Sequence, residues 1–121
     1  MKLLRIFATL SALLLIFAAC AADQSPDQIW ADAQSRGAIL LDVREPHEFV
    51  SGHVLGAINM PVGNVRFDIV TIAPDFDQEI LLICRTGNRT QNAEATLRAI
   101  GYTNVLDIGG VLDWPGELVT P

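Results

Sequence analysis

The sequence is poor in three kinds of residue that carry much of protein chemistry: 121 residues include two cysteines, two histidines and eight basic residues. Against 14 acidic residues, this gives a formal net charge of −6, which argues against a nucleic-acid partner. His47 and His53 have no acidic or cysteine neighbour at metal-ligand spacing, so we expect no metal and no cofactor. There is no internal repeat or low-complexity tract, and the length allows one domain.

The amino terminus has the pattern of a secretory signal peptide, which we assign to residues 1–22 and exclude from the fold, leaving a domain at 23–121. Lys2 and Arg5 precede an uncharged apolar run that ends in small residues. The stretch up to Cys20 resembles a bacterial lipobox, so we expect cleavage before Cys20, lipidation of Cys20, and a periplasmic or lipid-anchored protein of the cell envelope. The alternatives are ordinary cleavage after Ala21 or Ala22, and an uncleaved membrane anchor.

Either cleavage leaves Cys84 as the only thiol able to take part in folding or chemistry. An exported chain with one such cysteine cannot form an internal disulfide, so this cysteine is either reactive or buried. Loss of the leader also removes two basic residues and takes the formal net charge to −8. The two arginines next to Cys84 are therefore a local exception on an acidic protein.

Residues 79–90 join a buried-strand pattern to a short polar loop and then to a helical pattern. Cys84 follows the apolar run and faces the start of the helix. In open α/β sheets this edge binds ligands, and the free N–H groups of a first helical turn favour an anion. The expected core face of the helix is formed by Ala93, Leu97 and Ile100.

A cysteine in this position is expected to ionise readily. The helix dipole, the loop amides and the guanidinium groups of Arg85 and Arg89 all favour the thiolate, which is the nucleophile. The alternative is a buried cysteine at a strand end, flanked by two solvated arginines.

Three segments resemble the rhodanese-type sulfurtransferase family. Residues 84–90, CRTGNRT, are similar to the family's active-site loop, in which a cysteine opens a loop around its own sulfur. Residues 41–49, LDVREPHEF, and 52–61, GHVLGAINMP, are similar to its D-x-R-x-x-x-E-F-x-x-G-H-I-x-G-A-x-N-x-P signature. With Gly109-Gly110 and Trp114, the resemblance covers about residues 26–117.

Alternating strand and helix patterns predict one α/β domain with a mainly parallel sheet flanked by helices. The family's sheet has five strands, but almost nothing precedes Ser25 to form the first, so we expect a rhodanese-like domain with four to five strands. The apolar residues of 62–78 follow neither the helical nor the strand period, so we expect an irregular segment or a short helix there. Strands are expected at 38–43, 57–60, 79–83 and 104–108, and helices at 25–36, 46–50, 88–100 and 111–114.

The resemblance also implies a role for each site residue. Cys84 would carry the sulfur, Arg85 and Arg89 would bind an anionic donor, and the loop amides would stabilise charge on the bound sulfur. Arg44 and Glu48 would pair to hold the loops together, with Asp42 as a hydrogen-bond acceptor; an ordinary surface pair is the alternative. We interpret His53 as a hydrogen-bonded turn residue and His47 as a surface residue. The substrate-binding loop comprises Arg85, Thr86, Gly87, Asn88 and Arg89.

The resemblance predicts a thiosulfate-type sulfurtransferase that forms a persulfide on Cys84 and passes the sulfur to cyanide or a thiol. A cysteine phosphatase is a weaker alternative, because Cys84 and Arg89 show C-x4-R spacing instead of the C-x5-R of those enzymes. An envelope module that carries sulfur or senses an anion, with slow or no turnover, is the third. The sequence leaves the physiological donor, the acceptor and the oligomeric state open.

Overall fold

The computed structural model describes residues 24–121, so the predicted signal peptide and the predicted lipidation of Cys20 lie outside the described residues. Within that part of the chain, no helix is both long and apolar enough to span a bilayer.

The sheet of residues 24–121 has four parallel strands in the order β2-β1-β3-β4. This confirms the predicted parallel α/β architecture, with the lower of the two expected strand numbers. Every residue of the central strand β3 is buried, which explains its continuous apolar sequence. The strands are β1 (Ile39–Asp42), β2 (Ile58–Asn59), β3 (Ile80–Cys84) and β4 (Val105–Gly110).

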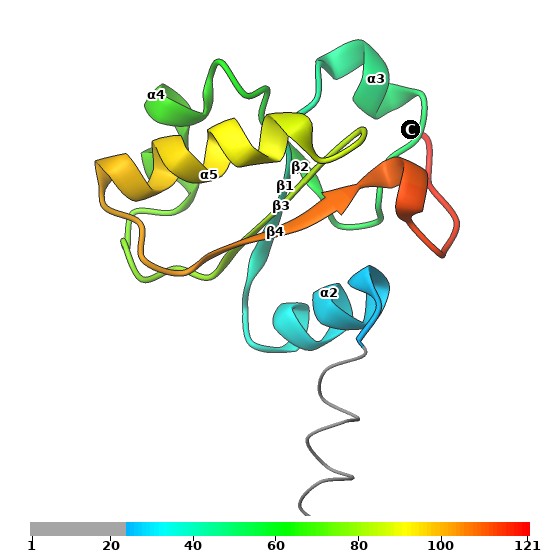
Figure 1. The fold of residues 1–121 in the computed structure, drawn as a ribbon, viewed down its shortest axis with the longest axis horizontal. Coiled ribbons are helices and arrows are strands. Elements are labelled where there is room, and N and C mark those ends of the chain that lie inside the picture. Colours follow the sequence, from blue (N-terminus) through cyan, green and yellow to red (C-terminus); the bar gives the residue numbers. More distant parts are fainter. Residues whose placement is uncertain (1–23) are drawn as a thin grey trace, which may run out of the picture.

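Helices cover both faces of this sheet, with α4 and α5 on one side and α2 on the other (Figure 1). The helix α4 lies in segment 62–78, whose apolar residues follow neither the helical nor the strand period. Of its side chains, only Val65 and Ile69 are buried. The helices are α2 (Pro26–Ser35), α3 (Pro46–Val50), α4 (Val65–Ile72), α5 (Asn88–Ile100) and the 3-10 turn η1 (Val111–Asp113).

Alternate residues of the buried strands feed two hydrophobic cores. Leu82 and Cys84 belong to the core under α4 and α5, whereas Leu81 and Ile83 belong to the core shared with α2. Trp30 packs in the second core, and its indole N–H donates to the Leu55 carbonyl at 3.3 Å. Cys84 is therefore fixed by sheet packing on the α5 side.

The helix boundaries follow the expected capping chemistry. Gln28 closes a capping box at the start of α2, where its Oε1 accepts from the Ser25 N–H at 3.1 Å. At the carboxyl end of α5, Gly101 has φ +119° and ends the helix as predicted.

The carboxyl-terminal segment returns to the end of the sheet where β1 and β3 finish, beside α3 and η1 (Figure 1). It is held there by an antiparallel bridge between His53 and Val119. The His53 N–H donates to the Val119 carbonyl at 2.9 Å, and the Val119 N–H donates back at 2.7 Å. The segment thus lies at the same end of the sheet as the Cys84 loop.

Candidate active site

Cys84 is the last residue of β3, and its side chain turns toward the first turn of α5. It is 1% exposed and is the free cysteine of the described residues. The Gly87 N–H donates to the Cys84 sulfur across 3.0 Å. A buried sulfur in this position meets backbone donors instead of water.

These donors set the acidity of the thiol. Burial on its own raises the pKa of Cys84, but the backbone N–H groups of the loop together outweigh burial and hold that pKa below its ordinary value. The predicted lowering of the thiol pKa is supported, and the loop amides are the leading cause of that lowering. The contributing N–H groups belong to Thr90, Gly87, Arg89 and Thr86.

The loop needs Gly87 and Thr90 to keep its amides directed at the sulfur. Gly87 has φ +102°, in the left-handed region, and occupies the N-cap of α5. The Thr90 hydroxyl is buried and donates to the Gly87 carbonyl at 2.7 Å, which ties the loop to the helix. With no side chain at the N-cap, the sulfur faces the first-turn amides directly.

Gly110 supports the loop from β4, a role that the sequence analysis missed. It pairs with Cys84 across the sheet, and a Cβ atom there would lie 2.2 Å from the Arg85 carbonyl oxygen. The same oxygen accepts from the Leu112 N–H at 3.2 Å. Gly109-Gly110 contributed only to the family resemblance in the sequence, whereas Gly110 is what lets the loop backbone lie against β4.

Asp42 and Arg44 form a buried ion pair at the site. Arg44 Nη2 lies 2.7 Å from Asp42 Oδ2 and Nε lies 2.9 Å from Oδ1. Arg44 also donates to the Gly52 carbonyl at 2.8 Å. The predicted pairing of Arg44 with Glu48 is wrong, because Asp42 is buried at the strand end and takes the nearest guanidinium to balance its charge.

Glu48 pairs instead with Arg89 of the Cys84 loop. Arg89 Nη1 and Nη2 donate to the two carboxylate oxygens at 2.6 and 2.9 Å. This pairing lowers the pKa of Glu48 to about 2, and it raises the pKa of Arg89. Arg89 was predicted to bind an anionic donor, and in the structure Glu48 already matches its charge.

The remaining loop side chains point outward. Arg85, Thr86 and Asn88 are exposed, and Arg85 forms no ion pair within residues 24–121. Asn59, quoted above only as part of a motif, donates to the carbonyls of Asp42 and Arg44 at 3.1 and 2.9 Å. A single asparagine at a strand end gave no signal of this bracing role.

Both histidines have the surroundings that the sequence predicted. His47 is exposed, and His53 Nδ1 lies 2.9 Å from the Phe49 carbonyl while its ring stacks on Phe49. Among residues 24–121 there is no group of three histidine, cysteine or acidic side chains that could hold a metal ion.

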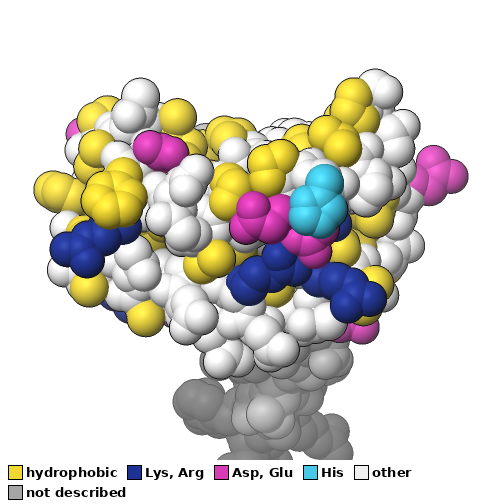
Figure 2. Space-filling view, turned by 90° about the horizontal axis from the view of Figure 1, so that it is seen from above, with side chains coloured by type: hydrophobic (Ala, Val, Ile, Leu, Met, Phe, Trp, Pro, Cys, Tyr) yellow, Lys and Arg dark blue, Asp and Glu magenta, His cyan; other side chains and the backbone are white. Residues whose placement is uncertain are grey.

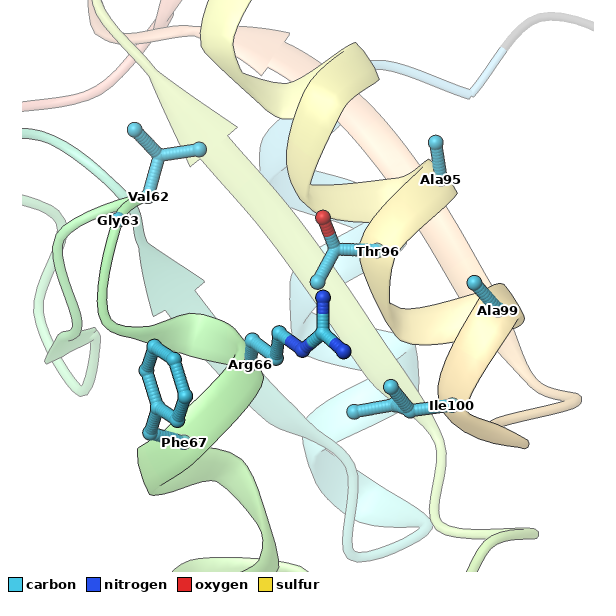
Figure 3. A pocket seen from close by; sticks show the side chains of 8 residues that line it. All are labelled: Val62, Gly63, Arg66, Phe67, Ala95, Thr96, Ala99 and Ile100. Carbon is cyan, nitrogen blue, oxygen red and sulfur yellow. The ribbon is translucent and has the colours of Figure 1, made fainter.

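A cleft of about 260 Å³ lies beside the cysteine loop, on the end of the molecule where acidic, basic and histidine side chains gather (Figure 2). A larger hollow of about 550 Å³ lies between α4 and α5, around Arg66 and Phe67 (Figure 3). It contains no residue of the cysteine loop, whereas the smaller cleft contains Arg85 of that loop, so size does not identify the site. That cleft is lined by Arg44, Glu48, Ser51, Gly52, Arg85, Val111, Leu112 and Leu118.

Comparison with known proteins agrees with this geometry. The family model of the Rhodanese-like domain matches residues 25–117. Thiosulfate sulfurtransferase PspE of Escherichia coli is 37% identical over 60% of this chain and 70% of its own, and thiosulfate sulfurtransferase GlpE of Pseudomonas entomophila is 35% identical over 77% and 87%. Among solved structures, a rhodanese with anions from E. coli is 33% identical, with a TM-score of 0.65 over 69% of this chain and 99% of its own.

Proposed function

Because this chain belongs to the rhodanese-like domain family, we propose that it is a sulfurtransferase that takes sulfur from thiosulfate onto Cys84 and passes it to cyanide or a thiol. The observation that carries the proposal is the buried Cys84 sulfur facing backbone N–H groups, with a pKa below its ordinary value. A thiolate held in this way is a nucleophile at neutral pH.

The reaction divides into two displacements. In the first, the Cys84 thiolate attacks the outer sulfur of thiosulfate, a new S–S bond forms, and sulfite leaves with the electron pair of the broken S–S bond. In the second, the acceptor attacks the outer sulfur of the persulfide, and Cys84 leaves as a thiolate. Each step transfers a sulfur atom between nucleophiles, so neither an oxidant nor a reductant is consumed.

The loop amides provide the stabilisation that both steps require. They are directed at the sulfur before the reaction begins, so they stabilise its negative charge without reorganisation. Arg85 is the loop cation that attracts the donor, because Arg89 is already neutralised by Glu48. The exposed side chains of Thr86 and Asn88 border the path by which the donor approaches.

The geometry weighs against a phosphatase. A tetrahedral phosphate needs several guanidinium donors above the loop, and two of the Arg89 N–H groups already donate to Glu48. The C-x4-R loop is also one residue shorter than that of cysteine phosphatases.

The direct test is intact mass spectrometry after incubation with thiosulfate. We expect one added sulfur atom on the wild-type protein, release of sulfite, and loss of both in Cys84→Ser, because a hydroxyl in this site has no base to activate it. Addition of cyanide should remove the extra sulfur as thiocyanate. Sulfite release that continued unchanged in Cys84→Ser would overturn the assignment.

We also propose that the protein is exported and lipid-anchored in the cell envelope. The support is the signal pattern of residues 1–22 and the lipobox-like approach to Cys20. Metabolic labelling with a palmitate analogue should mark the wild-type protein and leave Cys20→Ser unmarked. A soluble, unlabelled wild-type protein that begins at Ala22 or Asp23 would contradict the proposal.

A further inference from the structure

The hollow between α4 and α5 has the dimensions of a small-molecule site. Its volume of about 550 Å³ falls within the roughly 300 to 1,000 Å³ of known ligand pockets. Val62 and Ile100 line it and are partly buried against the core beneath α4 and α5. An added Cβ at Gly63 would meet nothing within 4 Å. The hollow therefore has an apolar lining and open space beside Gly63.

Phe67 adds an aromatic surface to the hollow without serving the core. It is 73% exposed and lies outside both hydrophobic cores of residues 24–121, because α4 buries Val65 and Ile69 instead. An exposed phenyl ring at the edge of an apolar hollow can stack on an aromatic ligand or meet it edge to face. The hollow therefore suits a ligand that carries an aromatic ring.

Arg66 supplies the charge of the hollow. Its side chain extends from α4 toward α5, where Thr96 and Ile100 face it (Figure 3). Within residues 24–121 it forms no ion pair, although the chain carries 14 acidic residues against eight basic ones. A guanidinium binds a carboxylate through two parallel hydrogen bonds. Arg66 is the only charged residue that lines the hollow, so a ligand with a single negative charge matches it.

We propose that this hollow binds an aromatic carboxylate, at a site separate from Cys84. The ring lies between Phe67 and the apolar lining of Val62 and Ile100, and the carboxylate meets the Arg66 guanidinium. No residue of the cysteine loop lines the hollow, so this binding does not depend on the proposed sulfurtransferase function.

The test is a titration of the full-length protein with 2-naphthoate, followed by saturation-transfer NMR of the probe. We expect a Kd on the order of 1 mM, which is the strength that ligand-efficiency limits give for a probe of this size. The matched probe 2-naphthamide has the same shape and no charge. Wild type should prefer the carboxylate by about two- to fivefold, as expected for an exposed charge pair, and added salt should erase the preference.

Two pairs of variants separate the charge from the ring. Arg66→Gln should remove the preference for 2-naphthoate and leave the binding of 2-naphthamide unchanged, whereas Arg85→Gln, at the cleft beside the cysteine loop, should keep the preference. Phe67→Ser should weaken the binding of both probes by about two- to tenfold. Leu55→Ser, which changes a side chain that is also 73% exposed, should not.

Three results would overturn the proposal. The first is a titration of wild type with 2-naphthoate that does not saturate by about 10 mM, tenfold above the expected Kd. The second is loss of the carboxylate preference in Arg85→Gln instead of Arg66→Gln, which would move the site to the other cleft. The third is unchanged binding of both probes in Phe67→Ser. None of these measurements involves sulfur transfer, so they decide the proposal whether or not Cys84 accepts sulfur from thiosulfate.

Discussion

The carboxylate of Glu48 accepts two hydrogen bonds from the Arg89 guanidinium, at 2.6 and 2.9 Å, and so joins α3 to the first turn of α5. Arg89 and Arg85 look equivalent in the sequence, since both flank the same short loop. The structure separates them: one holds the loop in place, and the other remains free to meet an anion.

Replacing Glu48 with glutamine should destabilise the protein by about 1 kcal/mol at neutral pH, the value for a well-formed but partly exposed pair. The pKa of Glu48 is about 2 in the folded protein and is ordinarily 4.5. A lowered folded-state pKa gives stability that is fully present above the unfolded value and is lost as the pH falls through the folded one. Urea denaturation should therefore show the gap between the two proteins closing from pH 4.5 to pH 2, and a gap independent of pH would contradict the assignment.

Replacing Arg85 with glutamine should raise the KM for thiosulfate severalfold and change kcat much less. Its charge attracts the donor equally in the ground state and in the transition state. Its loss therefore weakens the binding of thiosulfate without changing the barrier of the bound complex. Arg66→Gln removes another exposed arginine, from the hollow between α4 and α5, and serves as the control (Figure 3). Equal changes in the two variants would show that only the net charge matters.

Replacing Gly110 with alanine should displace the cysteine loop. The new Cβ would lie 2.2 Å from the Arg85 carbonyl oxygen, and the obstacle is backbone that has no rotamer to change. We expect a loss of about 1 to 3 kcal/mol in urea denaturation, as for other overpacked sites, together with loss of sulfite release. Gly63→Ala is the matched control, because nothing lies within 4 Å of its added Cβ. Retention of wild-type activity in Gly110→Ala would show that the loop tolerates the shift.

The sequence predicted the parallel sheet, the strand-loop-helix junction at Cys84 and the ends of α5, because each depends on local pattern. The apolar run of β3 indicates a central strand, and Gly101 marks a helix end. The low pKa of the thiol was also expected, since a helix amino terminus is itself a local feature. The loop amides, which the sequence also named as a cause, contribute most to this lowering.

What the sequence could not predict is which charged partners meet. Arg44 had Asp42 and Glu48 as candidate acceptors within a few residues, and only the path of the chain decides between them. Arg89 lies far from Glu48 in sequence, so no spacing rule links the two. The bracing by Gly110 and Asn59 likewise depends on how close two segments of backbone come, a distance that residue types do not encode.

The buried pair of Asp42 and Arg44 should behave differently from the surface pair of Arg36 and Glu79. Asp42→Ala leaves the Arg44 guanidinium buried without a counter-charge, so we expect a cost of about 3 to 5 kcal/mol in urea denaturation. Arg36→Ala opens an exposed pair and should cost about 0 to 1 kcal/mol. In a double-mutant cycle, Asp42→Ala with Arg44→Ala should cost less than the two single changes added together. Simple additivity would show that the two side chains act independently.

The acidity of Cys84 should depend on the hydroxyl of Thr90. That hydroxyl donates to the Gly87 carbonyl at 2.7 Å and keeps the loop amides directed at the sulfur. Thr90→Val preserves the shape of the side chain but removes this bond, so the amides should turn away and the pKa of Cys84 should rise toward its ordinary value. The measurement is the rate of iodoacetamide labelling against pH, because only the thiolate reacts and the rate falls with the thiolate fraction as the pH drops below the thiol pKa. Wild type should remain reactive to lower pH than Thr90→Val, while Thr96→Val, on the α4 side of the same helix, should match wild type. An identical inflection in all three proteins would show that the loop amides are held without Thr90.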